Sequence, residues 1–328
     1  MSLLSDNGVG VLLVNLGTPD APEPVAVRRY LAEFLSDPRV IEIPPLIWQP
    51  ILRGFILTTR PARSAEAYRQ VWTDEGSPLM AISKRQAARL RERLGDSISV
   101  GLEMRYGGSM DYVLSKMVDH GYGRILIAPL YPQYCAATTA SAMDAVFDAL
   151  KAMRAQPTIR ALPPYYDDPL YIGALKSNLG RQLAALDFTP DRLLLSFHGM
   201  PERTRQLGDP YHDQCQATAR LLAEEMSLPI DIAFQSRFGK AKWLEPATEA
   251  TLAAYPAAGV KKLAIAAPGF SADCLETLEE LGIRGRETFL AAGGTHFARL
   301  DCLNDSDEGM AMLDALIRRE LAGWWPAS

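Results

Sequence analysis

Short apolar runs of strand length alternate with longer amphipathic stretches along the whole chain. The apolar runs lie near residues 10–16, 97–103, 124–130, 157–162, 191–197, 229–235 and 261–267. They predict buried strands. The stretches with helical spacing lie near residues 22–35, 78–94, 109–119, 139–153, 168–185, 211–226 and 245–255. This alternation predicts an α/β fold, with parallel sheets that carry helices on both faces.

Three short segments recur in the same order, each at the end of a predicted strand. Residues 12–19 align without gaps on 194–201, residues 105–107 on 237–239, and residues 128–131 on 267–270. Each match alone is weak, but the shared order predicts two copies of one α/β unit. The Pro-rich stretch 162–169 breaks regular structure and is the expected boundary between them.

One predicted strand ends in a histidine. The run 191–197 is followed by His198, Gly199 and, two residues later, Pro201. Ligands of open α/β sheets bind at the carboxyl edge, so His198 is a candidate functional residue. A histidine that ends a strand and hydrogen-bonds to a loop is an equally good explanation of this segment alone. The repeat places Leu16 at the equivalent strand end, which suggests that both side chains face one cleft.

An acidic stripe follows the strand at 261–267. At 100° per residue, Asp273, Glu276 and Glu280 share one side of an α-helix, and Cys274 lies on a separate arc with two leucines. Acids in a first turn also suit the helix dipole, and Asp273 with Glu276 fits a capping box. Like charges at i,i+4 destabilise a helix slightly, however, so stability does not explain the whole stripe. A bound cation or a proton relay would explain why the three acids share one side.

Composition excludes several classes of protein. The 328 residues carry a net charge of −5, and this gives no basic field for nucleic acid. No apolar run is long enough for a transmembrane helix, and the amino end does not have the pattern of a signal peptide. The four cysteines are far apart, which is typical of reduced thiols in the cytoplasm. Dinucleotide-binding, phosphate-loop, zinc-protease and nucleophile-elbow motifs are not found.

Taken together, these segments resemble the ferrochelatase family, whose members insert ferrous iron into a porphyrin. The resemblance covers nearly the whole chain. It rests on residues 13–19, 76–79, 131–134, 196–201, 208–211, 235–239, 243–246 and 273–280. It implies two similar Rossmann-like, chelatase-like domains around a porphyrin cleft. The expected reaction forms protohaem from Fe²⁺ and protoporphyrin IX, the last step of haem biosynthesis, and releases two protons.

The resemblance also implies roles for single residues. His198 and Glu276 are expected to form the metal and proton site, since imidazole and carboxylate suit both tasks. Asp273 and Glu280 are expected to support them along a proton path. Four further residues are expected in the porphyrin pocket, although each fits a core position equally well: Leu16, Tyr106, Tyr131 and Trp243.

Departures from the family lead to further expectations. Cys274 stands where many relatives carry histidine, and it is either an accessory ligand or a packed small residue. Animal relatives bind an iron–sulfur cluster through a cysteine-rich tail and a cysteine at the position of Ala136. We therefore expect no iron–sulfur cluster and no permanently bound cofactor, and a monomer. The other three histidines are expected to be structural or on the surface.

The family also suggests how the chain is divided. Residues 1–162 are expected to form the first domain, with a helix at 306–328 packed back on it, and residues 163–305 the second. The apolar stretch 43–57 is too short and too rich in proline to span a bilayer. It is either a lip that contacts the membrane peripherally, supported by Trp324 and Trp325, or a buried connecting helix.

Three other functions stay open at this point. The chain could be a coproporphyrin ferrochelatase or a cobalt chelatase of the same fold. It could also be a haem or metal carrier without activity. A carrier would be expected to lack the catalytic residues, and the presence of His198 and Glu276 argues against it.

Overall fold

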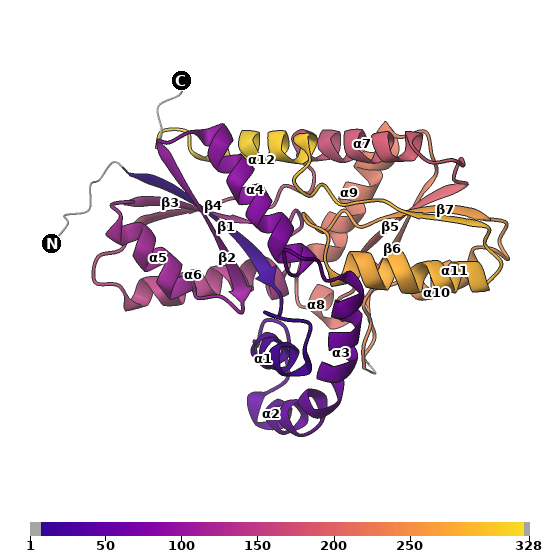
Figure 1. Ribbon diagram of the computed structural model, residues 1–328, viewed down its shortest axis with the longest axis horizontal. Coiled ribbons are helices and arrows are strands. Elements are labelled where there is room, and N and C mark those ends of the chain that lie inside the picture. Colours follow the sequence, from indigo (N-terminus) through magenta and orange to yellow (C-terminus); the bar gives the residue numbers. More distant parts are fainter. Residues whose placement is uncertain (1–7, 240, 325–328) are drawn as a thin grey trace. The chain divides into compact units, whose positions relative to one another are not determined.

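The computed structural model describes residues 8–239 and 241–324, which form two compact units. Unit 1 contains the described residues up to Tyr131, residues 135–163 and those from Met310 onward. Unit 2 contains residues 132–134 and 164–309. Each unit is built on a four-stranded parallel sheet flanked by helices (Figure 1), as the alternating pattern predicts.

The sheet of unit 1 has the strand order β2-β1-β3-β4. Its strands are β1 (Val9–Gly17), β2 (Ile98–Tyr106), β3 (Arg124–Pro129) and β4 (Thr158–Ala161). Its helices are α1 (Pro24–Phe34), α2 (Pro45–Ile51), η1 (Leu52–Ile56), α3 (Leu57–Val71), α4 (Pro78–Leu94), α5 (Met110–Asp119), η2 (Ala136–Ala140) and α6 (Ser141–Ala152). Helix α12 (Asp307–Glu320) lies in unit 1 from Met310 onward.

Unit 1 buries both faces of its central strand. Leu12 and Val14 of β1 pack in one cluster with apolar residues of α5 and α6. Because side chains alternate across a strand, Asn15 points to the other face, where its amide donates to the Ser83 hydroxyl of α4. Burial on both faces explains why this strand is a continuous apolar run in the sequence.

The sheet of unit 2 has the equivalent order, β6-β5-β7-β8. Its strands are β5 (Arg192–His198), β6 (Ile230–Gln235), β7 (Lys262–Ala266) and β8 (His296–Arg299). Its helices are α7 (Pro169–Ala184), α8 (Glu202–Gln206), α9 (Tyr211–Glu225), α10 (Thr248–Ala254), η3 (Glu276–Gly285) and α11 (Arg286–Ala291). One face packs against α10, α11 and η3, and α7 and α9 lie on the other (Figure 1). The equal strand order supports the predicted internal repeat.

The structure corrects the sequence prediction at three helices and one strand. Helix α3 covers residues for which no helix was predicted. The expected α-helix over 273–280 is a π-helix that begins at Glu276, so Asp273 lies before it. The predicted helix at 139–153 also begins with a π-helical turn. Strand β8 has only four residues and partly exposed side chains, so it left no apolar run to detect.

The segment 43–57 is not a buried connecting helix. It forms α2 and η1, and Leu46, Ile47 and Phe55 are 92, 59 and 64% exposed. Within residues 8–239 and 241–324, no helix is long and apolar enough to cross a membrane. Trp325 lies outside the described residues, whereas Trp324 stacks against the Arg160 guanidinium.

Candidate active site

His198 is the last residue of β5, and its ring is half-buried at the carboxyl edge of the sheet. Nδ1 lies 2.7 Å from the Gly199 carbonyl oxygen. A carbonyl can only accept, so Nδ1 carries the proton and donates it to this bond. The neutral imidazole therefore keeps its lone pair on Nε2, where it can bind a metal ion or accept a proton.

Gly199 brings the histidine strand close to its neighbour. Its N–H donates to the Gln235 carbonyl at 2.8 Å, and His198 and Gln235 are paired in register. A Cβ at position 199 would lie 2.4 Å from that carbonyl oxygen and 3.3 Å from the Trp243 ring. Only glycine permits this approach, which explains the His-Gly sequence at the strand end.

A buried polar network connects the histidine strand to the π-helix. The Ser196 hydroxyl of β5 donates to the Gln235 side-chain oxygen at 2.8 Å and also contacts the Thr248 hydroxyl. The Gln235 amide then donates to the Glu276 carbonyl oxygen at 3.1 Å. Gln235 therefore ties the first residue of η3 to the strand end that carries His198.

Glu276 lies beside a cysteine that stays protonated. Burial, followed by the charge of Glu276, raises the pKa of the Cys274 thiol well above its usual range. A metal-ligating cysteine needs the thiolate form, so this environment favours the packed residue over the accessory ligand. The thiol can also donate a hydrogen bond to the Glu276 carboxylate.

Glu280, one helical turn further along η3, is fully engaged by a single residue. Its carboxylate accepts from the Ser236 N–H at 2.7 Å and from the Ser236 hydroxyl at 2.5 Å. Ser236 holds a left-handed backbone conformation, with φ 63°. Glu280 therefore holds the end of β6 against the π-helix, in addition to any part in proton transfer.

Asp273 is a buried anchor before the π-helix. It is 3% exposed, and its carboxylate accepts hydrogen bonds from four neighbouring groups. The donors are Arg299 Nη1 at 3.0 Å, Asn304 Nδ2 at 2.7 Å, Thr277 Oγ1 at 2.7 Å and the Cys302 N–H at 3.3 Å. Full satisfaction of this carboxylate explains why an acid is buried at this point.

The four candidate porphyrin residues have different environments. Leu16 and Tyr131 of unit 1 are half-buried, Leu16 near the end of β1. Tyr106 is 1% exposed, and its hydroxyl contacts Asp37 and Ser141 at 2.9 Å. In unit 2, Trp243 is 4% exposed, and its indole N–H finds no hydrogen-bond partner in the described part of the chain.

The site therefore combines residues that the sequence predicts with residues that it does not. His198, Glu276 and Glu280 are connected through Gln235 and Ser236, to which the sequence analysis assigned no role. Polar residues that end an otherwise apolar strand were the available signal. Among the described residues, no three His, Cys, Asp or Glu side chains are grouped closely enough to hold a metal ion.

The chain is similar to known proteins over nearly its whole length. The family model described as ferrochelatase matches residues 8–321. A ferrochelatase of Mesorhizobium japonicum is 50% identical over 324 residues, which cover 96% of this chain and 92% of the relative. Ferrochelatase 2 of Shewanella oneidensis is 51% identical over 317 residues, with 94% and 97% covered. The chain belongs to the ferrochelatase family.

Solved structures agree with the ferrochelatase assignment at the level of the fold. SirB from Bacillus subtilis, solved with Fe³⁺, matches with a TM-score of 0.56 and 12% identity over 95% of this chain and 94% of that one. CbiX, described as the terminal enzyme for biosynthesis of sirohaem in denitrifying bacteria, matches with a TM-score of 0.51 and 16% identity. The match covers 94% of this chain and 98% of CbiX. The chelatase-like fold expected from the sequence is confirmed.

Proposed function

We propose that this protein inserts Fe²⁺ into protoporphyrin IX to form protohaem, with release of two protons. The reaction balances, because two pyrrole N–H protons leave and the porphyrin dianion binds the divalent iron. The observation that carries the proposal is the fixed ring of His198, whose Nδ1–H bond to Gly199 leaves the Nε2 lone pair free at the sheet edge of a ferrochelatase-family chain.

His198 and Glu276 are the groups that handle iron and protons in this proposal. A neutral imidazole accepts a pyrrole proton or ligates Fe²⁺ through the same nitrogen, and a carboxylate serves either task. Gln235 holds the backbone of Glu276 against the histidine strand. Glu280 and Asp273 support the site, Glu280 by holding the β6 end and Asp273 by anchoring the approach to η3.

Pocket residues carry the second part of the reaction, which is to hold and bend the macrocycle. We assign this task to Leu16, Tyr131 and Trp243, with Tyr106 as a buried support. The unpartnered indole N–H of Trp243 supports its assignment, because a buried donor without an acceptor is costly unless a ligand supplies one.

An anaerobic metallation assay tests the proposal. Purified protein is mixed with Fe²⁺ and protoporphyrin IX, and the absorbance change on metallation is followed. Parallel reactions contain coproporphyrin III with Fe²⁺, or sirohydrochlorin with Co²⁺. We expect turnover with Fe²⁺ and protoporphyrin IX. Turnover only in a parallel reaction, or in none, contradicts the proposal.

Variants then test the residue assignment. His198→Ala should lower kcat by about 10²-fold or more, the range expected when a general base is lost. His120→Gln is the matched control, because His120 is exposed and caps helix α5 in the other unit. A His198→Ala protein that metallates at the wild-type rate would refute the assignment and leave the family unchanged.

We further propose that residues 43–57 rest on a membrane surface and admit the apolar porphyrin there. Support comes from the exposure of Leu46, Ile47 and Phe55 on α2 and η1. Large exposed apolar groups of this kind are typical of an interaction surface. The double variant Leu46→Ser/Phe55→Ser should reduce flotation with vesicles of neutral phosphatidylcholine. Unchanged flotation contradicts the contact.

A further inference from the structure

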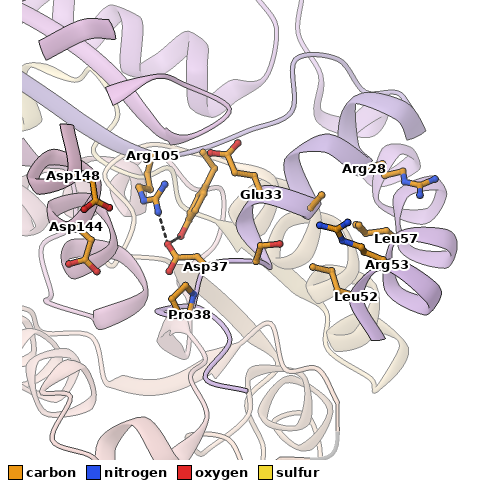
Figure 2. A pocket seen from close by; sticks show the side chains of 13 residues that line it. Arg28, Glu33, Asp37, Pro38, Leu52, Arg53, Leu57, Arg105, Asp144 and Asp148 are labelled. Atoms are coloured by element: carbon orange, nitrogen blue, oxygen red, sulfur yellow. Dashed lines mark hydrogen bonds and ion pairs between the residues drawn. The ribbon is translucent and has the colours of Figure 1, made fainter. Parts of the chain in front are cut away.

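Unit 1 contains a pocket of about 750 Å³ that is lined by none of the residues assigned to iron and protons, and by only one of the proposed porphyrin residues, the buried support Tyr106. It is lined by residues of α1, of the loop that follows α1, of η1, of α3, of the end of β2 and of α6 (Figure 2). The apolar part of the lining includes Ala32, Pro38, Leu52 and Leu57. Apart from Ser36 and Tyr106, the rest of the lining is charged, so the partner of each charge decides what the pocket can bind.

Each carboxylate of the lining already has a partner. Asp37 is held by Arg105 at 2.7 Å, and Glu33 accepts from the Gly107 N–H at 2.9 Å. The two acids of α6 are paired as well: Asp144 with Arg39 at 2.7 Å and Asp148 with Lys151 at 2.8 Å. In Figure 2 these two acids lie at the end of the pocket opposite Arg28 and Arg53. Three of the four carboxylates of the lining are therefore ion-paired, and Glu33 is held by a backbone N–H, so the lining offers no group of free carboxylates for a cation.

Two guanidinium groups of the lining have no acidic partner in the described part of the chain. Arg28 has no ion pair or hydrogen bond there, and Arg53 donates only its Nε, to the neutral Gln49 amide at 3.1 Å. Figure 2 shows both arginines at the same end of the pocket. Their unused N–H donors match the oxygens of a phosphate, which guanidinium groups bind in pairs of hydrogen bonds.

The residues around Arg53 indicate which kind of molecule carries this phosphate. Arg53 belongs to η1, between the exposed Ile47 and Phe55. Residues 43–65 contain three arginines and no acidic residue. Exposed apolar side chains that accompany unpaired cations are typical of a surface that binds an anionic bilayer.

We infer that Arg28 and Arg53 bind the phosphate of an anionic phospholipid, with the acyl chains lying against the exposed apolar residues of α2 and η1. The inference rests on the proposed membrane contact of residues 43–57 and adds a headgroup specificity to it. Pocket size supports it, since ligand pockets have volumes of about 300–1,000 Å³.

Vesicle flotation measures the headgroup preference directly. Vesicles of pure phosphatidylcholine are compared with vesicles of phosphatidylcholine and phosphatidylglycerol in equal parts, at low salt. Wild-type protein should prefer the anionic vesicles. Because each surface arginine contributes about 1 kcal/mol near such a bilayer, Arg28→Gln/Arg53→Gln should lose roughly 10- to 30-fold in affinity for them. Its binding to neutral vesicles should not change.

The matched control removes the same charge outside the pocket, from α1 and from α3, the helix that follows η1. Arg29 pairs with Asp20 at 2.9 Å, and Arg69 pairs with Glu66 at 2.6 Å. Arg29→Gln/Arg69→Gln should lose less than about threefold. An equal loss in both double variants would show that net charge alone attracts the protein, and would overturn the site.

Three other readouts separate the possible ligands. Soluble dihexanoyl phosphatidylglycerol should inhibit binding of the wild-type protein to anionic vesicles, and its failure to do so contradicts the site without any variant. Inorganic phosphate that binds with no vesicle preference would assign the pocket to a free anion. A raised KM for detergent-dispersed porphyrin in Arg28→Gln/Arg53→Gln would assign it to porphyrin carboxylates. Each of these two outcomes overturns the lipid assignment.

The proposed function and this inference can fail separately. Iron insertion is measured on the wild-type protein in detergent, without vesicles, whereas the phospholipid preference is measured with vesicles and without porphyrin. Absence of activity in the wild-type protein would reject the function alone. A wild-type protein that metallates porphyrin and shows no preference for anionic vesicles would reject the phospholipid site alone.

Discussion

Asp37 shows how single side chains stabilise unit 1. Burial opposes its ionisation, but hydrogen bonds from Ser141, the Arg39 N–H and Tyr106, with the Arg105 charge, lower the pKa of Asp37 below its usual value. A lowered pKa in the folded state stabilises the protein above the unfolded-state pKa of about 4, and this stabilisation is lost as the pH falls.

Asp37→Asn tests this role through pH. At pH 7 the variant should lose about 3 kcal/mol of unfolding free energy, because it leaves Arg105 partly buried without its partner. The difference from wild type should shrink below pH 4, as measured by urea unfolding. Asp144→Asn, which breaks an exposed pair in the same pocket, should cost less than about 1 kcal/mol at either pH.

Ser236 combines a hydrogen-bonding role with a strained backbone. Both Ser236→Ala and Ser236→Gly lose the hydroxyl that binds Glu280, but only glycine is relaxed at φ 63°. We expect Ser236→Gly to be more stable than Ser236→Ala by about 1 kcal/mol in thermal unfolding. Equal stability of the two variants would mean that the left-handed conformation costs nothing here.

At the scale of elements, η3 differs from the α-helix that periodicity predicts. The Glu280 carboxylate and the Glu276 carbonyl are held by Ser236 and Gln235 at the end of β6, so the position of η3 depends on strand-end residues. π-Helical turns occur often at functional sites, where an extra residue per turn redirects a side chain. Here the first π-helical residue is the proposed catalytic glutamate.

Gln235→Leu tests the coupling between strand and π-helix. Loss of both side-chain hydrogen bonds should let Glu276 shift and should lower kcat about tenfold or more, with a smaller change in KM. Gln206→Leu on α8, an exposed position, is the control and should keep full activity. If Gln235→Leu lowers the thermal stability and leaves kcat unchanged, Gln235 has a structural role only.

The secondary structure illustrates what periodicity can predict. The seven predicted strands are present within three residues of their expected limits, because strands buried on both faces are continuous apolar runs. Periodicity missed β8, the π-helical turns and helix α3, which contains an internal proline. A four-residue edge strand has little apolar content, and a π-turn is set by its packing contacts rather than by its own composition.

At the scale of the whole molecule, the two units can be followed separately through their cysteines. All four are free and buried: Cys135 lies in unit 1, and Cys215, Cys274 and Cys302 lie in unit 2. Native protein treated with iodoacetamide should therefore remain unlabelled, and urea-unfolded protein should gain four adducts, counted by mass spectrometry.

Leu194→Ala then tests whether the units have independent cores. Leu194 is fully buried in the unit 2 cluster, so its truncation should cost about 2–5 kcal/mol. In moderate urea, labelling of Cys215 should appear before labelling of Cys135. Leu207→Ala, at an exposed position of the same unit, is the control. Simultaneous labelling in Leu194→Ala would show one cooperative core.

The sequence by itself determined the α/β class, the duplicated unit, the strand that carries His198 and the family. These features depend on local composition, on order along the chain and on motifs, all of which are properties of the linear sequence. The tertiary structure decided the environment of each charge. It shows Asp273 as a satisfied anchor, Glu280 bound to Ser236 and Gln235 as the link between His198 and Glu276. It also shows that Arg28 and Arg53 have no acidic partner among residues 8–239 and 241–324. Hydrogen bonds and ion pairs between residues distant in sequence depend on packing, which no local pattern records.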